Sequence, residues 1–319
     1  MMGISAYLKD IGRGKDGARA LSREHAGDLM GLILDGEVSE LEIGAFCIAM
    51  RVKGETPHEL AGFLDAIHAR LPALPRTDTP TVVLPSYNGA RKLPVLTPLL
   101  GLLLARQGVR VLIHGQTRDP GRVTTFEVLE ALSGDPALPI HLCTAAPTVG
   151  TQAGVHFLPT AGLLPALQRL LDVRRVIGLR NSAHSLVKLM QPVPGVLLVS
   201  SYTHPEYLHS MGALFELTGQ RAMLLRGTEG EPVADPRRAP QMDLFEHGIR
   251  QTVQPVQNGP LTHLPELPAG QDAEATASYI RAMLAGDVAV PTPITLQVQH
   301  LAAALSPSLP TLSPLEATP

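Results

Sequence analysis

Aromatic side chains are scarce in this chain of 319 residues: tryptophan is absent, and aromatic residues together make up 3% of the chain. A surface that binds nucleic acid by stacking bases on aromatic rings therefore has few residues to draw on. There are two cysteines, Cys47 and Cys143, which lie in apolar contexts without a Cys-x-x-Cys partner. This pattern argues against a disulfide framework and a structural zinc site, and it favours a reducing compartment.

Long apolar runs are also missing. Residues 1–17 mix charged and small side chains and contain no apolar stretch of the kind that a signal peptide needs. The longest apolar stretch, Val95–Ala105, is too short to cross a bilayer. We therefore expect a cytoplasmic protein with no membrane partner. Hydrophobic residues still make up 45% of the chain, which is enough to form the core of one large domain or two unequal ones.

The formal net charge is -3, which by itself argues against a nucleic-acid-binding protein. The charges are, however, unevenly distributed. From Pro80 to Pro192 there are eleven Lys or Arg residues against five Asp or Glu, a balance of +6, so the rest of the chain sums to -9. One basic surface on an otherwise acidic protein supports anion binding. A set of solvated helix faces explains the same counts, so both interpretations stay open at this point.

Two capping boxes mark helices in the first seventy residues. In the peptides Ser39–Glu42 and Thr56–Glu59, the Ser or Thr side chain can cap the amide three residues on, and the Glu can reach back. Apolar residues follow each box at helical spacing. The proline-containing segment Arg70–Thr81 is typical of a linker. We therefore expect an N-terminal helical domain over residues 1–75.

Beyond the linker, short β-branched runs alternate with helical stretches. This order predicts a larger α/β domain over residues 76–305, with a mainly parallel central sheet covered by helices. The tail, residues 306–319, has four prolines and one charge and is expected to be disordered. Strands are expected at 81–84, 109–114, 155–158, 196–200 and 221–225, and helices at 93–106, 123–132, 163–171, 206–217, 273–285 and 293–305.

Ligands of such sheets bind at the carboxyl ends of the strands, and three segments there carry polar groups. The first is Pro85–Lys92, the second is His114–Thr117, and the third is Val173–Lys188, which is rich in Arg and Lys. A phosphate cradle needs several glycines so that backbone amides can approach the anion, and the first segment has only Gly89. This single glycine is followed by the basic pair Arg91-Lys92.

These segments, together with Leu34–Ser39 and Met50–Thr56, resemble the anthranilate phosphoribosyltransferase family over nearly the whole chain. The resemblance implies a small helical domain, a larger α/β domain and a homodimer formed through the helical domains. It also implies a cleft between the domains. Members of the family use that cleft to bind phosphoribosyl pyrophosphate with magnesium and to transfer ribose phosphate to an amine.

The departures from the family pattern concern phosphate and metal binding. The Gly-Thr-Gly-Gly-Asp loop of the family falls on Ser86–Ala90, which lacks two of the three glycines and the carboxylate. Its Lys-His-Gly-Asn-Arg falls on Ile113–Thr117, which keeps His-Gly and loses both cations. Its Asp-Glu magnesium pair falls on Pro232-Val233, which offer no side-chain oxygen to a hard cation. Glu229 or Glu231 could substitute only if the loop were rearranged. We therefore expect no metal and no cofactor.

The peptides Pro85–Arg91, Arg180–His184 and His204–Tyr207 resemble a branch of the family that is non-enzymatic and binds nucleic acid as a dimer. The resemblance implies that this chain has no catalytic residues and binds DNA or RNA backbones without sequence preference. The basic residues expected to do so are Arg13, Lys15, Arg91, Lys92, Arg174, Arg175, Arg180 and Lys188. A degenerate substrate cleft that admits a small anion is expected at Ser86, Asn88, Gly89, His114, Gly115, Asn181 and His184.

Two other functions stay open from the sequence. One is a glycosyl- or phosphoribosyltransferase that acts on a substrate other than anthranilate, and the other is a small-molecule sensor without turnover. His114 and His184 are candidate bases, but no carboxylate pattern marks either as activated, so hydrogen-bonded histidines are favoured. The glycine-containing peptide Gly12–Lys15 follows no strand and lacks P-loop spacing, which favours a turn with exposed cations.

Two groups of basic residues allow specific expectations. If their segment is helical, Arg180, His184 and Lys188 share one helix face, and a repulsive stripe of this kind favours a bound anion. Arg106 and Arg110 flank the turn between a helix and a strand, so we expect both to be solvated.

Overall fold

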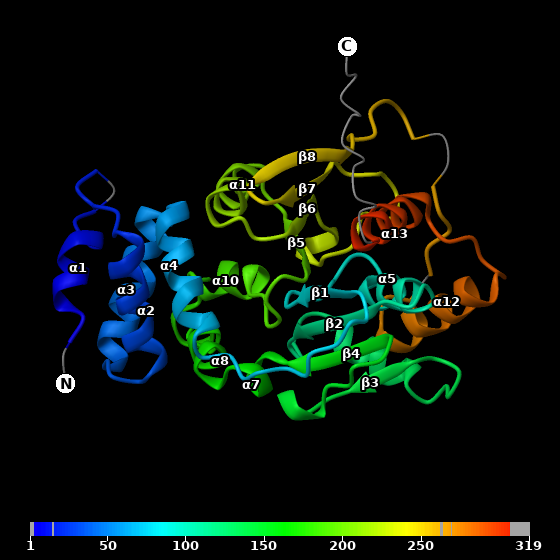
Figure 1. The fold of residues 1–319 in the computed structure, drawn as a ribbon, viewed down its shortest axis with the longest axis horizontal. Helices are drawn as coiled ribbons and strands as arrows, with labels where there is room; N and C mark the ends of the chain where they lie inside the picture. The colour runs from blue at the N-terminus through cyan, green and yellow to red at the C-terminus, as the bar shows by residue number, and fades with distance from the viewer. Residues whose placement is uncertain (1–2, 15, 262–263, 269, 307–319) are drawn as a thin grey trace, which may run out of the picture.

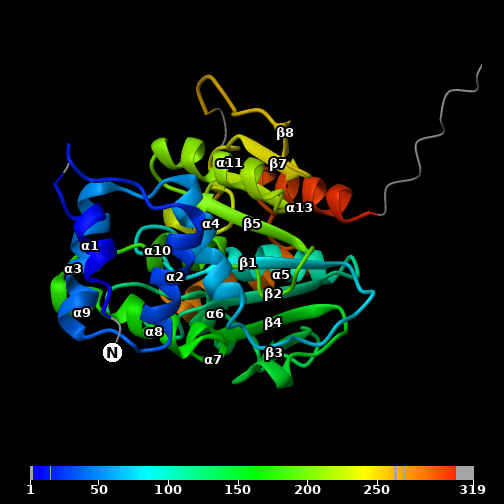
Figure 2. The same ribbon diagram turned by 60° about the vertical axis from the view of Figure 1, so that its left-hand side comes forward.

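The computed structural model describes residues 3–306 except residues 15, 262, 263 and 269. Expectations for Lys15 and for residues 307–319 of the tail lie outside the described residues. The helical part, in blue in Figures 1 and 2, lies to one side of the sheet in both views. It consists of α1 (Ser5–Ile11), α2 (Arg23–Leu34), α3 (Glu40–Lys53) and α4 (Pro57–His68).

Helices α3 and α4 both begin with the capping boxes that the sequence predicts. The Ser39 side chain accepts a hydrogen bond from the backbone amide of Glu42, and the Glu42 carboxylate accepts one from the backbone amide of Ser39. Thr56 and Glu59 form the same pair of hydrogen bonds at the start of α4. The fully buried Glu59 carboxylate also accepts hydrogen bonds from Lys53 Nζ at 2.6 Å and from the Leu21 amide at 2.9 Å. Glu59 therefore joins α3, α4 and the segment that precedes α2.

The described residues form an eight-stranded sheet in the order β3-β4-β2-β1-β5-β6-β7-β8. The strands from β3 to β6 in this order are parallel, whereas β7 and β8 pair antiparallel at one edge. The mainly parallel sheet that the sequence predicts is confirmed. Their bounds are β1 (Thr81–Ser86), β2 (Arg110–Gly115), β3 (Ile140–Leu142), β4 (Gly154–Pro159), β5 (Leu197–Tyr202), β6 (Ala222–Arg226), β7 (Met242–Glu246) and β8 (Ile249–Gln254).

Helices cover both faces of the sheet, because the side chains of the central strands alternate between the two faces and are buried on both. On β1, for example, Val82 belongs to a buried cluster that includes residues of α5 and α13, whereas Val83 belongs to a second cluster with residues of α8, α10 and α11. The remaining helices are α5 (Thr97–Ala105), α6 (Thr125–Leu132), α7 (Thr160–Leu163), α8 (Pro165–Asp172), α9 (Arg174–Ile177), α10 (Ala183–Leu189), α11 (Glu206–Thr218), α12 (Ala273–Ala285) and α13 (Thr292–Leu305), with 3₁₀ turns at Ala146–Thr148 and Thr228–Gly230.

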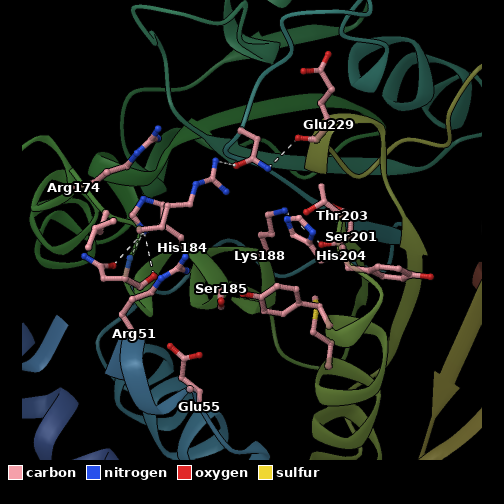
Figure 3. A pocket seen from close by; sticks show the side chains of 18 of the residues that line it. Arg51, Glu55, Arg174, His184, Ser185, Lys188, Ser201, Thr203, His204 and Glu229 are labelled. Atoms are coloured by element: carbon pink, nitrogen blue, oxygen red, sulfur yellow. Dashed lines mark hydrogen bonds between the residues drawn. The ribbon is translucent and has the colours of Figure 1, made fainter. Parts of the chain in front are cut away.

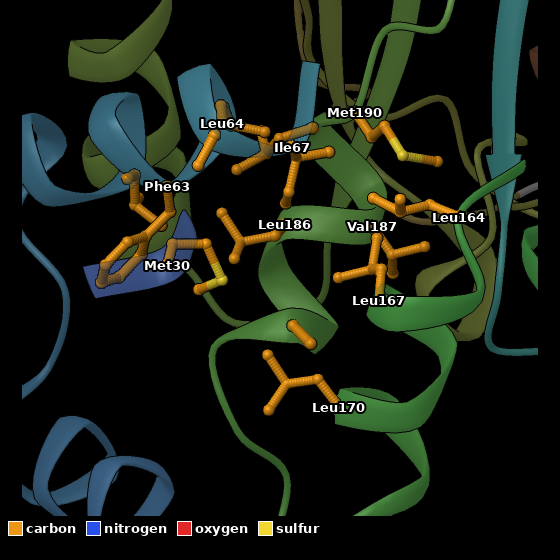
Figure 4. Close-up of a cluster of buried hydrophobic side chains, with 14 of the residues drawn as sticks. Met30, Phe63, Leu64, Ile67, Leu164, Leu167, Leu170, Leu186, Val187 and Met190 are labelled. Carbon is orange, nitrogen blue, oxygen red and sulfur yellow. The ribbon is translucent and has the colours of Figure 1, made fainter. Parts of the chain in front are cut away.

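The helical part shares a continuous apolar core with the α/β part, as Figure 4 shows. Phe63, Leu64 and Ile67 of α4 lie in the same buried cluster as Leu186 and Met190, at the end of α10. Residues 69–80 contain no helix or strand and lead from α4 into β1, near the expected division at residue 75. The packing of α4 on the α/β part fixes α3 beside the carboxyl ends of the strands.

Arg110 is buried rather than solvated, so the expectation for this residue is wrong. It is 0% exposed at the start of β2, between β1 and β4, and its Nη1 donates to the carbonyl of Pro75 at 3.0 Å. Burial lowers the pKa of its guanidinium. Arg106 is exposed, as expected. Of the helices in the described residues, none is both long enough and apolar enough to span a membrane.

Candidate functional site

A pocket of about 780 Å³ lies where the strand order reverses beside β1. The chain places β2 and β4 on one side of β1 and β5 on the other, so the loops after β1 and β5 diverge, which is where α/β sheets bind ligands. Figure 3 shows Arg51 and Glu55 of α3 on the opposite side of the view from Glu229. The loop after β1 contributes Asn88, Arg91 and Lys92, and the end of β5 and the loop after it contribute Ser201, Tyr202, Thr203 and His204.

Basic side chains dominate the lining of this pocket. The described lining residues include seven Lys or Arg side chains against two carboxylates, Glu55 and Glu229. A cleft lined by one sign of charge concentrates ions of the opposite sign. The seven are Arg51, Arg91, Lys92, Arg122, Arg174, Arg180 and Lys188, six of which come from the basic stretch between Pro80 and Pro192.

Arg180 is held by a neutral group rather than by a carboxylate. Its Nη2 donates to Asn88 Oδ1 at 3.1 Å, and no carboxylate of the described residues lies within ion-pair distance of Arg180 or of Arg174. Burial, followed by the charges of Arg174 and Arg122, lowers the pKa of Arg180. These arginines therefore keep unneutralised positive charge in the cleft.

Lys188 lies inside the pocket and not on an outer helix face. It is 9% exposed, and its Nζ donates to the carbonyl oxygens of Gly230 at 3.0 Å and Ser201 at 3.5 Å. Burial lowers its pKa to about 8. Helix α10 begins at Ala183, so Arg180 precedes the helix and the expected stripe of three residues is not formed.

His184 is a buried, hydrogen-bonded histidine, as the sequence analysis favours. The backbone amide of Asn181 donates to its Nδ1 at 3.2 Å, and the ring of Tyr87 meets it edge-on at 5.4 Å. Burial, followed by the charge of Arg180, lowers the pKa of His184 to about 3. His184 is therefore neutral at physiological pH.

Two carboxylates occupy the backbone donors of the loop after β1. Glu231 is buried and accepts hydrogen bonds from the Gly89 amide at 2.7 Å and from the Ser86 hydroxyl. Glu229 accepts hydrogen bonds from the amides of Arg91, Lys92 and Leu93 at 2.7–3.1 Å.

These residues do not fit a magnesium ion. The positions of the family's acidic pair carry Pro232 and Val233, both buried, and neither has a side-chain oxygen. The carboxylates of Glu229 and Glu231 already accept hydrogen bonds from backbone amides, and Glu231 also accepts one from the Ser86 hydroxyl. The described part of the chain contains no group of three or more His, Cys, Asp or Glu residues that could hold a metal.

The structure brings together about half of the expected site residues. Ser86, Gly89, His114 and Gly115 are buried and do not line the pocket. Gly115 lies against β1 so closely that a Cβ there would be 1.8 Å from the Ser86 carbonyl oxygen. The expected residues that line the pocket are Asn88, Arg91, Lys92, Arg174, Arg180, Asn181, His184 and Lys188.

The other expected cations lie outside the pocket. Arg175 points into solvent, and its Nε lies 3.3 Å from Asp172 Oδ1. Arg13 lies in the turn after α1, and its Nη2 lies 3.9 Å from Asp10 Oδ1. His114 is buried in β2, where its Nε2 lies 3.4 Å from the Met190 carbonyl oxygen and burial lowers its pKa to about 4.

Several lining residues were not singled out from the sequence as site residues. Arg51 and the peptide His204–Tyr207 contributed only to the family resemblance. Glu229 was considered only as a substitute metal ligand. Glu55 belongs to the peptide Met50–Thr56 that carries the family resemblance, Arg122 to the basic stretch from Pro80 to Pro192, and Ser185 to the segment Val173–Lys188, but nothing in the sequence marks any of the three as a site residue.

Comparisons with known proteins place this site in a family. Residues 5–70 match the model for the helical bundle domain of the glycosyl transferase family. An anthranilate phosphoribosyltransferase of Methanopyrus kandleri is 30% identical, with 90% of this chain and 85% of the relative covered. The structure of anthranilate phosphoribosyltransferase from Thermus thermophilus superposes with a TM-score of 0.69 at 24% identity, covering 93% of this chain and 87% of that one. The chain therefore belongs to the anthranilate phosphoribosyltransferase family.

Within that family the chain is YbiB-like. The uncharacterized protein YbiB of Escherichia coli is 39% identical over 301 residues, which cover 93% of this chain and 92% of YbiB. The resemblance to the family and the fold class expected from the sequence are both confirmed.

Proposed function

We propose that this protein binds nucleic acid through backbone phosphates, without sequence preference. The observation that carries the proposal is the cleft at the carboxyl ends of the strands, where seven basic side chains face two carboxylates. Arg91 and Lys92 are exposed, so phosphates can reach them without opening the fold. Contacts to phosphates position a nucleic acid but carry no sequence information, so DNA and RNA of mixed sequence should bind alike.

Transfer of ribose phosphate to anthranilate does not fit this cleft. The donors of the loop after β1 are occupied by Glu229 and Glu231, and the metal positions carry Pro232 and Val233. Losing one preorganised donor typically costs ~3 kcal/mol of transition-state stabilisation, and several groups are missing here together. We expect no turnover with phosphoribosyl pyrophosphate, magnesium and anthranilate. A rate of ~1 per second, ordinary for an enzyme, would contradict this part of the proposal.

A homodimer formed through the helical part belongs to the same proposal. Leu41, Ile48 and Val52 on α3 are 84%, 42% and 54% exposed, and their spacing places them along one side of the helix. A second copy of this chain would cover these apolar side chains and bring two clefts into one assembly. Replacing Ile48 with Asp should shift the mass in solution from dimer to monomer, whereas a parent chain that sediments as a monomer would exclude this interface.

The cleft also favours a small anion as a second, weaker ligand. Its volume of about 780 Å³ lies in the range of small-molecule sites, and its lining is basic. Millimolar phosphate or sulfate should therefore raise the melting temperature. No thermal shift and no heat of binding at these concentrations would show that the pocket does not take anions.

Charge reversal tests the nucleic-acid proposal directly. Arg174 and Arg175 on α9 make no contact that the fold needs beyond the surface ion pair of Arg175 with Asp172. The double variant Arg174→Glu/Arg175→Glu should bind a mixed-sequence oligonucleotide at least tenfold more weakly, which is a change of about 1.4 kcal/mol. The matched control, Arg76→Glu/Arg106→Glu, makes the same charge change near the amino ends of β1 and β2 and should bind like the parent. Equal weakening in both variants would show that net charge, and not the basic residues in and beside this cleft, controls binding.

A further inference from the structure

The loop after β1 directs a run of backbone N–H groups at the side chain of Glu229. Glu229 Oε1 accepts hydrogen bonds from the backbone amides of Arg91 at 3.1 Å, Lys92 at 2.7 Å and Leu93 at 3.1 Å. Glu229 Oε2 lies 3.1 Å from the Arg91 amide nitrogen. The guanidinium of Arg122 lies 3.8 Å from Oε2. Successive amides that converge in this way form an anion-binding nest, and here the anion is a carboxylate of the same chain.

The nest faces the ligand cleft and not the protein core. Glu229 lines the pocket, and its side chain is 16% exposed. Figure 3 shows the Glu229 side chain extending away from Lys188 and His184. Arg91, Lys92 and Arg122 also line the pocket, so an anion that entered this part of the cleft would reach these amides if the carboxylate were absent.

The backbone at Glu229 is strained and is held in place by hydrogen bonds from neighbouring side chains. Glu229 has a φ of 51°, a conformation that residues other than glycine seldom adopt, and such strain persists only where surrounding contacts impose it. Asn88 Nδ2 donates to the Glu229 carbonyl at 3.2 Å, and Gly230 O accepts from Lys188 Nζ at 3.0 Å and Ser201 Oγ at 2.8 Å. Gly230 has a φ of 89°, which favours glycine, and a Cβ there would lie 2.0 Å from Asn88 Nδ2.

We propose that Glu229 is a specificity-determining residue, an internal anion that fills a phosphate-binding nest and excludes phosphate and diphosphate groups from it. Removing the carboxylate frees three amides and takes away a repulsive negative charge at a site that opens to the cleft. Ligand anions in the native protein are left with the arginine side chains. The inference does not depend on nucleic-acid binding, because it concerns the backbone donors of residues 91–93 and not the partner of the arginines.

Pyrophosphate without magnesium is the probe that tests the nest. In titration calorimetry, Glu229→Ala should bind pyrophosphate at least tenfold more tightly than the parent, a gain of about 1.4 kcal/mol. Glu229→Gln should gain less, because the amide side chain removes the charge but still accepts from the loop. The control Glu130→Ala removes a glutamate that pairs with Arg118 at 2.7 Å outside the nest, and should leave the affinity unchanged. Equal pyrophosphate affinity in Glu229→Ala and the parent would overturn the proposal.

Hydrogen exchange in the native protein gives a second test that needs no variant. The amides of Arg91, Lys92 and Leu93 should exchange slowly in the free protein, and pyrophosphate should not slow them further, because Glu229 already accepts their hydrogen bonds. Fast exchange in the free protein that pyrophosphate then slows would show that the nest is vacant and takes the ligand itself.

Discussion

Individual side chains around the cleft have shifted pKa values because the fold buries them. His184 is kept neutral beside Arg180, and Lys188 Nζ donates to two carbonyl oxygens, with no carboxylate of the described residues within ion-pair distance. The sequence predicts that these residues are near one another. It does not predict the burial of Lys188, which depends on where α10 begins and on how the turn at Thr228–Gly230 closes over the loop after β1.

The neutral state of His184 predicts a specific acid sensitivity. Its native pKa of about 3 lies below the ordinary 6.5, so between these values the unfolded chain binds a proton that the native chain does not. The His184 contribution to stability is therefore complete above pH 6.5 and falls as the pH drops toward 3. In urea unfolding at pH 6.5 and 4.5, the parent should lose about 2 kcal/mol more than His184→Gln. An identical loss in both proteins would show that His184 is protonated without cost in the native state.

At the scale of elements, the buried pair of Lys53 and Glu59 connects α3 to α4. The two side chains are 8% and 0% exposed and 2.6 Å apart, whereas Arg23 and Asp65, also 2.6 Å apart in the helical part, are about half exposed. Lys53→Met leaves the Glu59 carboxylate buried without its cation and should lower the free energy of unfolding by about 3–5 kcal/mol. Arg23→Met, the matched surface control, should cost at most ~1 kcal/mol. Denaturant unfolding measures both, and similar costs would show that burial does not separate the two pairs.

Element by element, the sequence predicts those parts of the fold whose signals are local. The capping boxes place the starts of α3 and α4, and continuous apolar runs locate β1, β2, β4, β5 and β6. The sequence does not predict the antiparallel pair β7 and β8: β8 is largely exposed and carries no continuous apolar run, and the buried strand β7 has a charged residue, Asp243, within it. Arg110 was placed wrongly for a related reason: its burial comes from neighbouring strands and from Pro75, which its own flanking residues do not reveal.

For the candidate site, the sequence predicts the cleft and most of its cations. It does not predict how the loop donors are satisfied. The pairing of Glu229 with the amides of residues 91–93 joins positions more than 130 residues apart, and it depends on a positive φ at a residue that is not glycine. No spacing rule in the sequence encodes that conformation.

At the scale of the whole molecule, the basic stretch between Pro80 and Pro192 does not form one uniform surface. Arg110 is buried, and Arg118 pairs with Glu127 and Glu130 at 3.9 Å and 2.7 Å. Six of its eleven cations nevertheless line one cleft, and α3 adds Arg51 from the helical part. The net charge of the chain is -3, so the excess of acidic residues lies elsewhere. A polyanion that approaches the cleft is therefore attracted by the local positive potential.

The salt dependence of nucleic-acid affinity tests the central claim most directly. Each neutralised phosphate releases counterions and contributes roughly -0.7 to -0.9 to the slope of log affinity against log salt. A dimer that makes about three phosphate contacts in each subunit should give a slope near -4 to -5 with mixed-sequence DNA, and a similar slope with a second, unrelated sequence. An affinity that ignores salt, or one that differs strongly between the two sequences, would contradict binding through backbone phosphates at this cleft.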